Sequence, residues 1–280
     1  MARTQGALKE RPLPELRQLA AGGPPYPRGL LTVLRNDERR GAQALYAACL
    51  RALRKHRREN ARFKAMWDYE AKAFGSGFRR VAGVDEAGRG PLAGPIVGAA
   101  VILREPVPGV DDSKKLLPAE RETLYDELMA GAHWIATEVI SHDMIDQLGI
   151  QTANYMALAN AAAKLEPPAD FLLVDGFKVP GCPTPHERIV KGDSLSQSIA
   201  AASIIAKVTR DRLMLEYDLR YPDYGFCSHK GYTTQKHLAA LNALGPCPIH
   251  RKSFAPVTAN GQITLDFTTT TKDEVECDLL

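Results

Sequence analysis

The sequence predicts an α/β protein, built as a sheet with helices on its faces, with a small helical extension before the sheet and a helical part after it. Two observations lead to this class. From residue 81 onward, short apolar runs rich in β-branched residues alternate with longer helix-forming stretches. Apolar residues make up 45% of the 280 residues and charged residues 25%, so the chain can bury a sizeable core and is not globally disordered.

The first 77 residues form the expected helical extension. Pro12 and Pro14 interrupt its opening, and the stretch 75–77, Gly-Ser-Gly, marks its end. A helix is expected from residue 42 to residue 50 and onward through the basic stretch 51–64, which contains neither proline nor glycine.

Charge separates this extension from the rest of the chain. Residues 1–78 hold 16 Lys and Arg against 7 Asp and Glu, a net charge of +9, whereas the residues after them hold 20 against 26, a net charge of −6. Clustered basic side chains displace counterions from nucleic acid, so the stretch 51–64 is a candidate phosphate-facing arm. A solvated helix face without any partner explains the same charges equally simply.

The predicted elements of the sheet follow in chain order. Five runs have the length and composition of strands, namely Val81–Val84, Ile96–Leu103, Trp134–Ile140, Phe171–Val174 and Glu187–Val190. The stretches 146–165, 196–220 and 237–244 have helical composition, and two consecutive prolines follow the first of them. The first half of 196–220 is rich in serine and alanine, so this helix can pack closely on its neighbours.

Composition also excludes several classes of protein. The longest apolar run, Gly94–Leu103, is too short to span a bilayer, and the N-terminus lacks the apolar segment of a secretory signal. The five cysteines include no CxxC pair, which argues against a disulfide framework or a structural zinc site. We therefore expect a cytoplasmic protein with reduced thiols.

Acidic residues stand where three predicted strands end. Asp85 and Glu86 follow the first strand, Asp175 follows Phe171–Val174, and Asp193 comes shortly after the last strand. Adjacent strands of an open α/β sheet would bring these groups together at one edge. Turn formation or helix N-capping explains a single acid in such a place, and Asp193 directly before a long helix suits a cap as well as a site.

Four converging carboxylates cannot all be ionised in a dry site without compensating charge. Oxygen ligands without a matching set of cysteines and histidines favour Mg²⁺ or Mn²⁺ over zinc or copper. Two such ions close together can act on one scissile phosphate, so the cluster indicates phosphodiester chemistry.

Three further pieces suit a nucleic-acid substrate. Gly88-Arg89-Gly90 differs from a dinucleotide-binding fingerprint, but its glycines allow the backbone to approach a sugar and read a 2′-hydroxyl group. Lys114 and Lys115 lie in a polar loop that could contact phosphate. Aromatic residues interleaved with His229 and Lys230, ending at Tyr232, could stack on a base or sugar. A plain turn, a solvated helix start and ordinary loop packing are the structural alternatives for these three pieces.

Taken together, these fragments resemble the ribonuclease HII family. Seven motifs occur in the family's order, namely Val84-Asp-Glu-Ala-Gly-Arg-Gly-Pro91, Asp112-Ser-Lys-Lys115, Leu173-Val-Asp-Gly176, Lys191-Gly-Asp193, the stretch from Ala200 to Asp211, His229-Lys-Gly-Tyr232 and the stretch from Pro248 to Pro256. The resemblance covers roughly two-thirds of the chain. It leaves the basic extension outside.

The resemblance implies a ribonuclease H-like mixed sheet within a catalytic domain over 78–262. The threonine-rich composition near the end of the chain predicts a flexible tail over 263–280. It implies a metal-dependent endoribonuclease that cuts the RNA strand of RNA–DNA hybrids. Such an enzyme also cuts 5′ of a single ribonucleotide in duplex DNA, leaving a 3′-hydroxyl and a 5′-phosphate, with two divalent ions per site.

Residue roles carry over motif by motif. Asp85, Glu86 and Asp175 would hold metal most directly, and Asp193 would serve the second metal position. Substrate binding would fall to Gly88, Arg89, Gly90, Lys114, Lys115 and Tyr232, with the backbone of the glycine motif reading the 2′-hydroxyl and Tyr232 stacking at the ribonucleotide–deoxyribonucleotide junction. Asp211 lies inside a helix and is interpreted as structural.

Two other functions remain open at this point. A type III ribonuclease H shares the sheet but needs longer RNA tracts, and the glycine motif and Tyr232 argue against it. A nucleic-acid-binding protein without catalysis could use the same basic arm, but such a protein gains nothing from acids that face phosphate. The expected partner is an RNA–DNA hybrid or ribonucleotide-containing duplex, bound by a monomer that does not associate with membranes.

Overall fold

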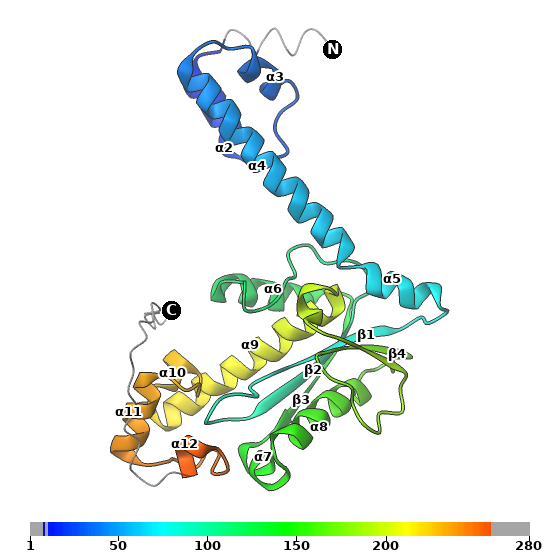
Figure 1. Cartoon of the computed structure of the whole chain (residues 1–280), viewed down its shortest axis with the longest axis vertical. Coiled ribbons are helices and arrows are strands. Elements are labelled where there is room, and N and C mark those ends of the chain that lie inside the picture. The colour runs from blue at the N-terminus through cyan, green and yellow to red at the C-terminus, as the bar shows by residue number, and fades with distance from the viewer. Residues whose placement is uncertain (1–7, 9–10, 259–280) are drawn as a thin grey trace. The chain divides into compact units, whose positions relative to one another are not determined.

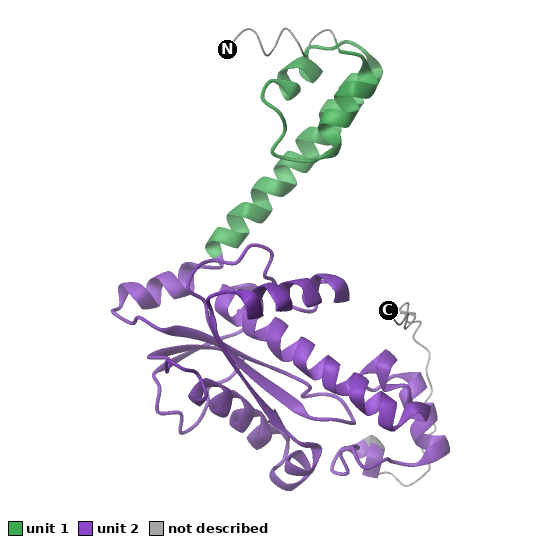
Figure 2. Cartoon of the chain, turned by 180° about the vertical axis from the view of Figure 1, so that it is seen from behind, with its two compact units in different colours: residues 1–65 green, residues 66–280 purple. Residues whose placement is uncertain are grey.

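A computed structural model of the chain describes residue 8 and residues 11–258. The chain divides into two compact units, Met1–Ala65 and Met66–Leu280 (Figure 2). The tail expected over 263–280 lies outside the described residues. Among the residues that are described, no helix is both long and apolar enough to cross a membrane.

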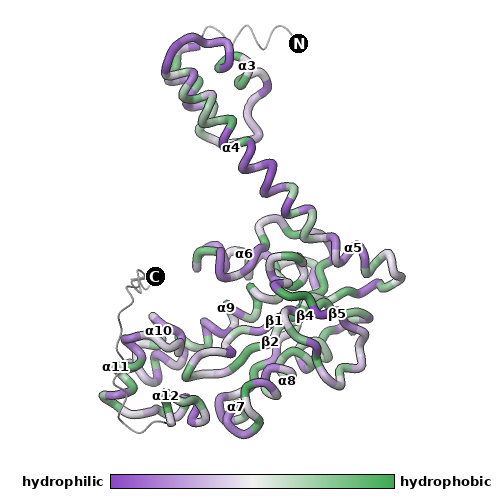
Figure 3. Tube along the Cα trace, viewed as in Figure 1, coloured by the Kyte–Doolittle hydropathy of each residue, from purple (hydrophilic) through white to green (hydrophobic). Residues whose placement is uncertain are grey.

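The first unit is helical. It contains α2 (Leu13–Ala21), α3 (Leu30–Arg35) and α4 (Arg40–Ala65), which pack around a small core that includes the fully buried Leu16, Leu30 and Leu34. The prolines do not break the opening, because Pro12 occupies the N-cap position of α2 and a second proline falls in its first turn, where a missing N–H costs nothing. The helix predicted through the basic stretch is confirmed as part of α4, whose later turns are strongly hydrophilic (Figure 3).

The second unit begins before the expected boundary at residue 77, because α5 (Asp68–Gly75) belongs to it. The buried carboxylate of Glu70 on α5 accepts hydrogen bonds from Ser196 Oγ at 2.6 Å and from the backbone N–H of Ser198 at 2.9 Å. These bonds tie α5 to the start of a long helix far along the sequence, so the glycines at 75 and 77 end a helix without separating two units.

A five-stranded mixed sheet forms the centre of this unit (Figure 1). Its strands are β1 (Val81–Ala87), β2 (Ile96–Ile102), β3 (Trp134–Ile140), β4 (Phe171–Asp175) and β5 (His186–Ile189). They lie in the order β3-β2-β1-β4-β5, with antiparallel pairing from β3 to β1 and parallel pairing from β1 to β5. All the strands predicted from the sequence are present.

Two helices cover opposite faces of the sheet, α8 (Ile150–Ala163) on one and α9 (Gln197–Arg220) on the other (Figure 1). Each helix crosses a strand at a glycine. A Cβ atom on Gly83 of β1 would lie 2.0 Å from the backbone of Ser198 on α9, and one on Gly98 of β2 would lie 2.3 Å from the backbone of Ala157 on α8. The small residues predicted at the start of α9 allow this close contact.

The remaining helices extend these layers. The helix expected over 146–165 is two helices, α7 (His142–Leu148) and α8, because Gly149 between them takes a left-handed φ of 78°. One helix that the sequence did not predict, α6 (Pro118–Ala130), packs beside α9. The helical C-terminal part consists of α10 (Phe226–His229), α11 (Gln235–Leu244) and α12 (Ala255–Thr258), and two 3-10 turns, η1 (Gly192–Ser194) and η2 (Pro222–Tyr224), flank α9.

Candidate active site

Strand register brings Asp85 and Asp175 side by side. The parallel pairing of β1 and β4 matches Val84 with Val174, so the next residue of each strand is an aspartate at the same level of the sheet. Side chains alternate along a strand, and both aspartates fall on the face that α9 covers. Ser203 of α9 contributes a side-chain hydrogen bond to Asp85, which is only 4% exposed.

Glu86 follows Asp85 on β1 and is half-buried. Its Oε2 atom is buried and has no hydrogen-bond partner among the described residues. Burying a carboxylate oxygen without a hydrogen-bond donor costs free energy, so this oxygen is suited to bind a cation or to accept a hydrogen bond from water.

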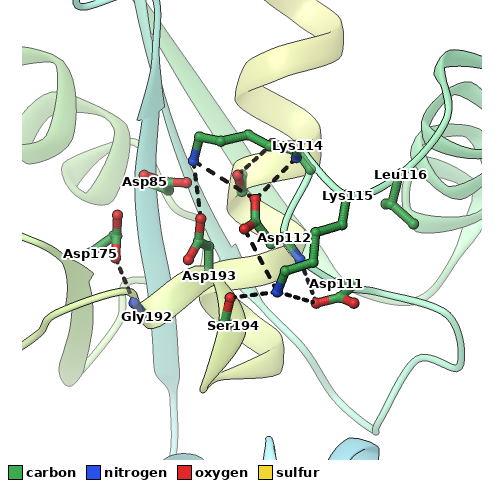
Figure 4. Close-up of polar contacts among 12 residues, drawn as sticks. Asp85, Asp111, Asp112, Lys114, Lys115, Leu116, Asp175, Gly192, Asp193 and Ser194 are labelled. Atoms are coloured by element: carbon green, nitrogen blue, oxygen red, sulfur yellow. Dashed lines mark hydrogen bonds and ion pairs between the residues drawn. The ribbon is translucent and has the colours of Figure 1, made fainter. Parts of the chain in front are cut away.

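Asp193 reaches the same edge of the sheet from η1. Lys191 before it adopts a left-handed φ of 59°, and this turn directs the Gly192 N–H to Asp175 Oδ1 at 2.6 Å (Figure 4). Asp193 itself is 5% exposed. It does not cap the following helix, since the side chain of Ser196 accepts the capping bond of α9. The capping interpretation of Asp193 is therefore wrong.

The carboxylates oppose one another's ionisation. Burial raises the pKa of Asp85 well above its usual range, and the charges of Glu86 and Asp175 raise it further. Burial and then Asp175 raise the pKa of Glu86 to about 7. Burial also raises the pKa of Asp175, although its bond from Gly192 favours the ionised form. Positive charge placed near these buried, mutually repelling acids stabilises their ionised form.

Two lysines supply part of that charge. Lys114 Nζ lies 3.1 Å from Asp193 Oδ2 and 3.8 Å from Asp112 Oδ1 (Figure 4). Burial opposes its charged form, but the hydrogen bond and charge of Asp193 prevail and the pKa of Lys114 is raised. Lys115 Nζ donates to Ser194 Oγ at 2.8 Å and lies 3.5 Å from Asp111. Both ammonium groups therefore stand at the rim of the acidic site rather than on a remote helix start.

The donor set fits hard divalent cations. Every acidic group at this edge offers oxygen, and no described histidine or cysteine joins them. No three acidic, histidine or cysteine side chains within residues 8 and 11–258 are already gathered as a complete ligand group. The site thus brings the oxygen donors to one edge, and the unpartnered oxygen of Glu86 and the raised pKa of Asp85 mark where positive charge is accommodated.

The Gly-Arg-Gly loop leaves β1 directly after these acids. Gly88 takes a φ of 98°, and a Cβ atom there would lie 2.1 Å from the side chain of Arg210, so only glycine fits. The Arg89 guanidinium donates to Gln151 Oε1 at 2.6 Å and lies 4.4 Å from the ring centre of Phe177. With its side chain held in this way, the loop leaves Gly90 exposed.

Tyr232 lies in the loop between α10 and α11, with its ring beside α9. The residue is 38% exposed, and the centre of its ring lies 5.4 Å from the guanidinium carbon of Arg210 and 5.7 Å from Lys207 Nζ. Lys207 also forms an ion pair with Asp211 at 2.6 Å. An exposed aromatic ring beside two cations is suited to stacking on a nucleobase or sugar.

Arg251 supports the glycine loop, a role that the sequence did not predict. Arg251 is fully buried and donates to the carbonyl oxygens of Gly88 at 2.6 Å and Arg89 at 3.0 Å. The sequence predicted no role for Arg251 itself. The available signal was the family motif from Pro248 to Pro256, which contains His250 and Arg251.

Comparisons with known proteins agree with this geometry. The Ribonuclease HII family model matches residues 82–257, and the Ribonuclease HII N-terminal domain model matches residues 18–74. The ribonuclease HII of Geobacillus kaustophilus (strain HTA426) is 49% identical over 227 residues, covering 80% of this chain and 87% of that protein. The ribonuclease HII of Geobacter sulfurreducens is 54% identical over 195 residues, covering 69% of this chain and 90% of that protein.

Solved structures show the same fold. The crystal structure of ribonuclease H2 from Pyrococcus horikoshii OT3 matches with a TM-score of 0.56 and 27% identity, covering 64% of this chain and 96% of that chain. The family model spans the whole sheet, the acidic edge and the C-terminal helices. The chain therefore belongs to the ribonuclease HII family and is a metal-dependent ribonuclease H, a hydrolase of phosphodiester bonds.

Proposed function

We propose that the chain hydrolyses the RNA strand of RNA–DNA hybrids and also cuts on the 5′ side of a single ribonucleotide embedded in duplex DNA, leaving a 3′-hydroxyl and a 5′-phosphate. The observation that carries this proposal is the register of β1 and β4, which sets Asp85 beside Asp175 with the Gly-Arg-Gly loop directly after them. Membership of the ribonuclease HII family supports the hybrid as substrate.

Asp85, Glu86 and Asp175 would hold one divalent cation, Mg²⁺ or Mn²⁺, and Asp193 would complete the position of a second. When bound, these ions supply positive charge against the scissile phosphate and acidify an attacking water. Lys114 would keep Asp193 turned toward this edge and, with Lys115, neutralise a neighbouring phosphate of the substrate strand.

Recognition of the ribonucleotide would fall to the backbone of Gly88, Arg89 and Gly90. A 2′-hydroxyl both donates and accepts, so main-chain groups that approach it closely distinguish RNA from DNA. Close approach requires residues without large side chains, and the Arg89 side chain is turned away onto Gln151 and Phe177. Tyr232 would stack at the junction between the ribonucleotide and the following deoxyribonucleotide.

Cleavage of two labelled substrates tests the proposal. One is a DNA duplex with a single ribonucleotide and the other is a continuous RNA–DNA hybrid, each with Mg²⁺ or Mn²⁺ and with EDTA as control. The parent should cut both, and Asp85→Asn should lose at least about 10³-fold of the rate, because it removes one charge from the metal-binding acids while keeping the side-chain shape. Glu127→Gln, an exposed substitution on α6, is the matched control and should keep full activity.

The outcomes separate the competing functions. Cleavage of the hybrid without cleavage at the single ribonucleotide would support a type III specificity instead. Binding without cleavage of either substrate would support a non-catalytic nucleic-acid-binding protein. Cleavage by Asp85→Asn at the parent rate would exclude the acidic edge as the site of chemistry.

The basic stretch of α4 is the proposed duplex-binding arm. Arg51, Arg54, Arg57 and Arg58 are exposed on a helix of 26 residues. An acidic catalytic unit that binds a polyanion gains affinity from such a group of cations. The N-terminal domain model of the same family matches this region, which supports a role in the enzyme's work.

Charge substitution within the full chain tests the arm, since truncation at residue 78 would also remove Glu70 and its bonds to α9. Replacing Arg54, Arg57 and Arg58 by glutamine should raise KM and reduce the slope of log affinity against log salt by up to about 3. The same positions changed to lysine keep the charge and should keep the slope. An unchanged slope in the glutamine variant would contradict the proposal.

We also propose a cellular location and an oligomeric state. Cys49, Cys182 and Cys247 are free thiols, and the proposed substrate is intracellular nucleic acid, so we place the protein in the cytoplasm. All groups of the proposed site come from one chain, which supports action as a monomer.

A further inference from the structure

Three histidines and an arginine form a buried polar cluster away from the acidic edge. His237, His250 and Arg251 are 0% exposed and His229 is 7% exposed. The rings of His229 and His237 stack with centroids 4.4 Å apart. None of these side chains reaches the carboxylates, and the proposed chemistry does not use them. Buried polar groups are retained when each has a hydrogen-bond partner, and the three histidine side chains have such partners within the C-terminal part.

The carbonyl of Tyr232 determines which nitrogen carries the proton in His237 and in His250. His237 Nδ1 lies 3.0 Å from Tyr232 O, which can only accept, so Nδ1 of His237 carries the proton and donates. Burial lowers the pKa of His237 and of His250 to about 4, so both rings are neutral at pH 7. His237 Nε2 is then an acceptor, and His250 Nε2, 3.0 Å away, must donate to it. His250 Nδ1 in turn accepts the N–H of Cys247 at 2.9 Å.

The result is a directed chain of hydrogen bonds from Cys247 N–H through His250 and His237 to the carbonyl of Tyr232. The same carbonyl accepts the N–H of Thr234 at 2.9 Å, so both of its lone pairs are used. The backbone position of Tyr232 is thereby tied to the loop that contains His250.

The next residue of that loop is tied to the glycine motif. Besides its bonds to Gly88 and Arg89, Arg251 donates to Gly94 O at 3.0 Å and to Pro95 O at 3.2 Å. Its own N–H donates to Leu92 O at 2.8 Å. A guanidinium group that serves four carbonyl oxygens holds both ends of the loop between β1 and β2.

The Tyr232 loop is also pressed directly against this segment. Leu92 N–H donates to Gly231 O at 2.8 Å, and a Cβ atom on Gly231 would lie 2.6 Å from Ala93 O. Lys230 adopts a left-handed φ of 50°, a conformation that surrounding contacts must enforce in a residue with a side chain. These contacts therefore fix the position of the backbone before Tyr232 relative to residues 92–93.

We propose that His237, His250 and Arg251, here called the C-terminal brace, are positioning residues that hold Tyr232 and the Gly-Arg-Gly loop at a fixed separation and thereby set the preference for a ribonucleotide–deoxyribonucleotide junction. The proposal rests on the proposed function of those two recognition elements. His250 and Arg251 are consecutive, so one residue orients the junction tyrosine while its neighbour orients the 2′-hydroxyl reader. A junction offers its ribose and its deoxyribose a fixed distance apart, and a rigid reader of both needs such a link.

The readout is the ratio of kcat/KM on a duplex with one ribonucleotide to kcat/KM on a continuous hybrid, whose interior has no such junction. His250→Phe keeps an aromatic ring but removes the donor to His237, and it should lower this ratio about 10-fold. His250→Gln places an amide donor near the Nε2 position and should restore the ratio to within about 3-fold of the parent. Tyr232→Ala should lower the ratio about 5-fold or more through lost stacking.

A double-mutant cycle separates positioning from general destabilisation. If the brace acts through Tyr232, His250→Phe in the Tyr232→Ala background should change the ratio by less than about 2-fold. Leu241→Ala, on the same helix as His237 and 6% exposed, should lower the melting temperature without changing the ratio. If His250→Phe does not fold, Arg251→Lys takes its place, because lysine keeps the charge but loses the planar fork.

The outcomes distinguish failure of the proposed function from failure of the C-terminal brace. A parent that does not cut at a single ribonucleotide overturns the proposed function, whatever the variants do. A parent that cuts there, with an unchanged ratio in the folded His250 or Arg251 variant, overturns the brace alone. Full additivity with Tyr232→Ala, or an equal fall of the ratio in Leu241→Ala, likewise overturns it.

Discussion

Glu86→Gln should make the metal-free protein more stable at alkaline pH. The pKa of Glu86 rises from 4.5 to about 7 because the side chain is buried and lies near Asp175. In the unfolded chain the carboxyl loses its proton near pH 4.5, whereas in the folded protein it holds the proton until about pH 7. The stabilising contribution of this group is therefore complete below pH 4.5 and lost as the pH rises through 7.

The size of the effect follows from the two pKa values. Their difference corresponds to about 3 kcal/mol in the free energy of unfolding. For a unit of this length, that free energy is equivalent to a melting temperature higher by about 6–12 °C. Glutamine resembles the protonated acid, so the variant should avoid the loss at pH 8 and match the parent at pH 4.5.

Thermal unfolding in EDTA at several pH values between 4.5 and 8.5 measures this difference, with Glu127→Gln as the exposed control. Added Mg²⁺ or Mn²⁺ should raise the melting temperature of the parent at pH 8 more than that of Glu86→Gln, because cation binding stabilises only the folded state. Parallel curves for parent and Glu86→Gln at every pH would refute the reasoning that burial and like charge destabilise the ionised site.

Two substitutions test the packing that supports the site. Gly83→Ala would place a methyl group 2.0 Å from the backbone of Ser198, so it should lower the free energy of unfolding by about 3 kcal/mol or more, whereas Gly75→Ala, in open space on α5, should change it by less than about 1 kcal/mol. Chemical denaturation of both variants compares the two, and equal stabilities would contradict the close crossing of α9 on β1. Glu70→Ala removes the acceptor of Ser196 Oγ–H and Ser198 N–H, so it should lower the free energy of unfolding by about 1–3 kcal/mol in the same denaturation experiment. Amide hydrogen exchange should increase most at the start of α9. Exchange there as slow as in the parent would show that these bonds do not anchor the helix.

Local pattern was sufficient for the strands and for the acidic residues at their ends. The runs beginning at Val81 and Phe171 are apolar because both faces of those strands are covered by helices, and this burial is visible in composition alone. The basic helix through 51–64 was likewise predictable from the absence of breakers. The sequence pattern failed to predict two features of the helices. Gly149, with its positive φ, divides a helix that composition presents as continuous, and α6 was not predicted because it begins at a proline in a polar stretch.

Tertiary structure alone decided which of these residues meet. Only the pairing of Val84 with Val174 places Asp85 beside Asp175, and the resulting burial, together with the charges of the neighbouring acids, raises their pKa values. The contacts of Glu70 with Ser196 and of His250 with His237 join residues far apart or without any spacing signal. The physical reason is that a sequence pattern encodes the burial of a face through its period, whereas the partner of a hydrogen bond or a charge is set by register and close packing between elements, which no local period records.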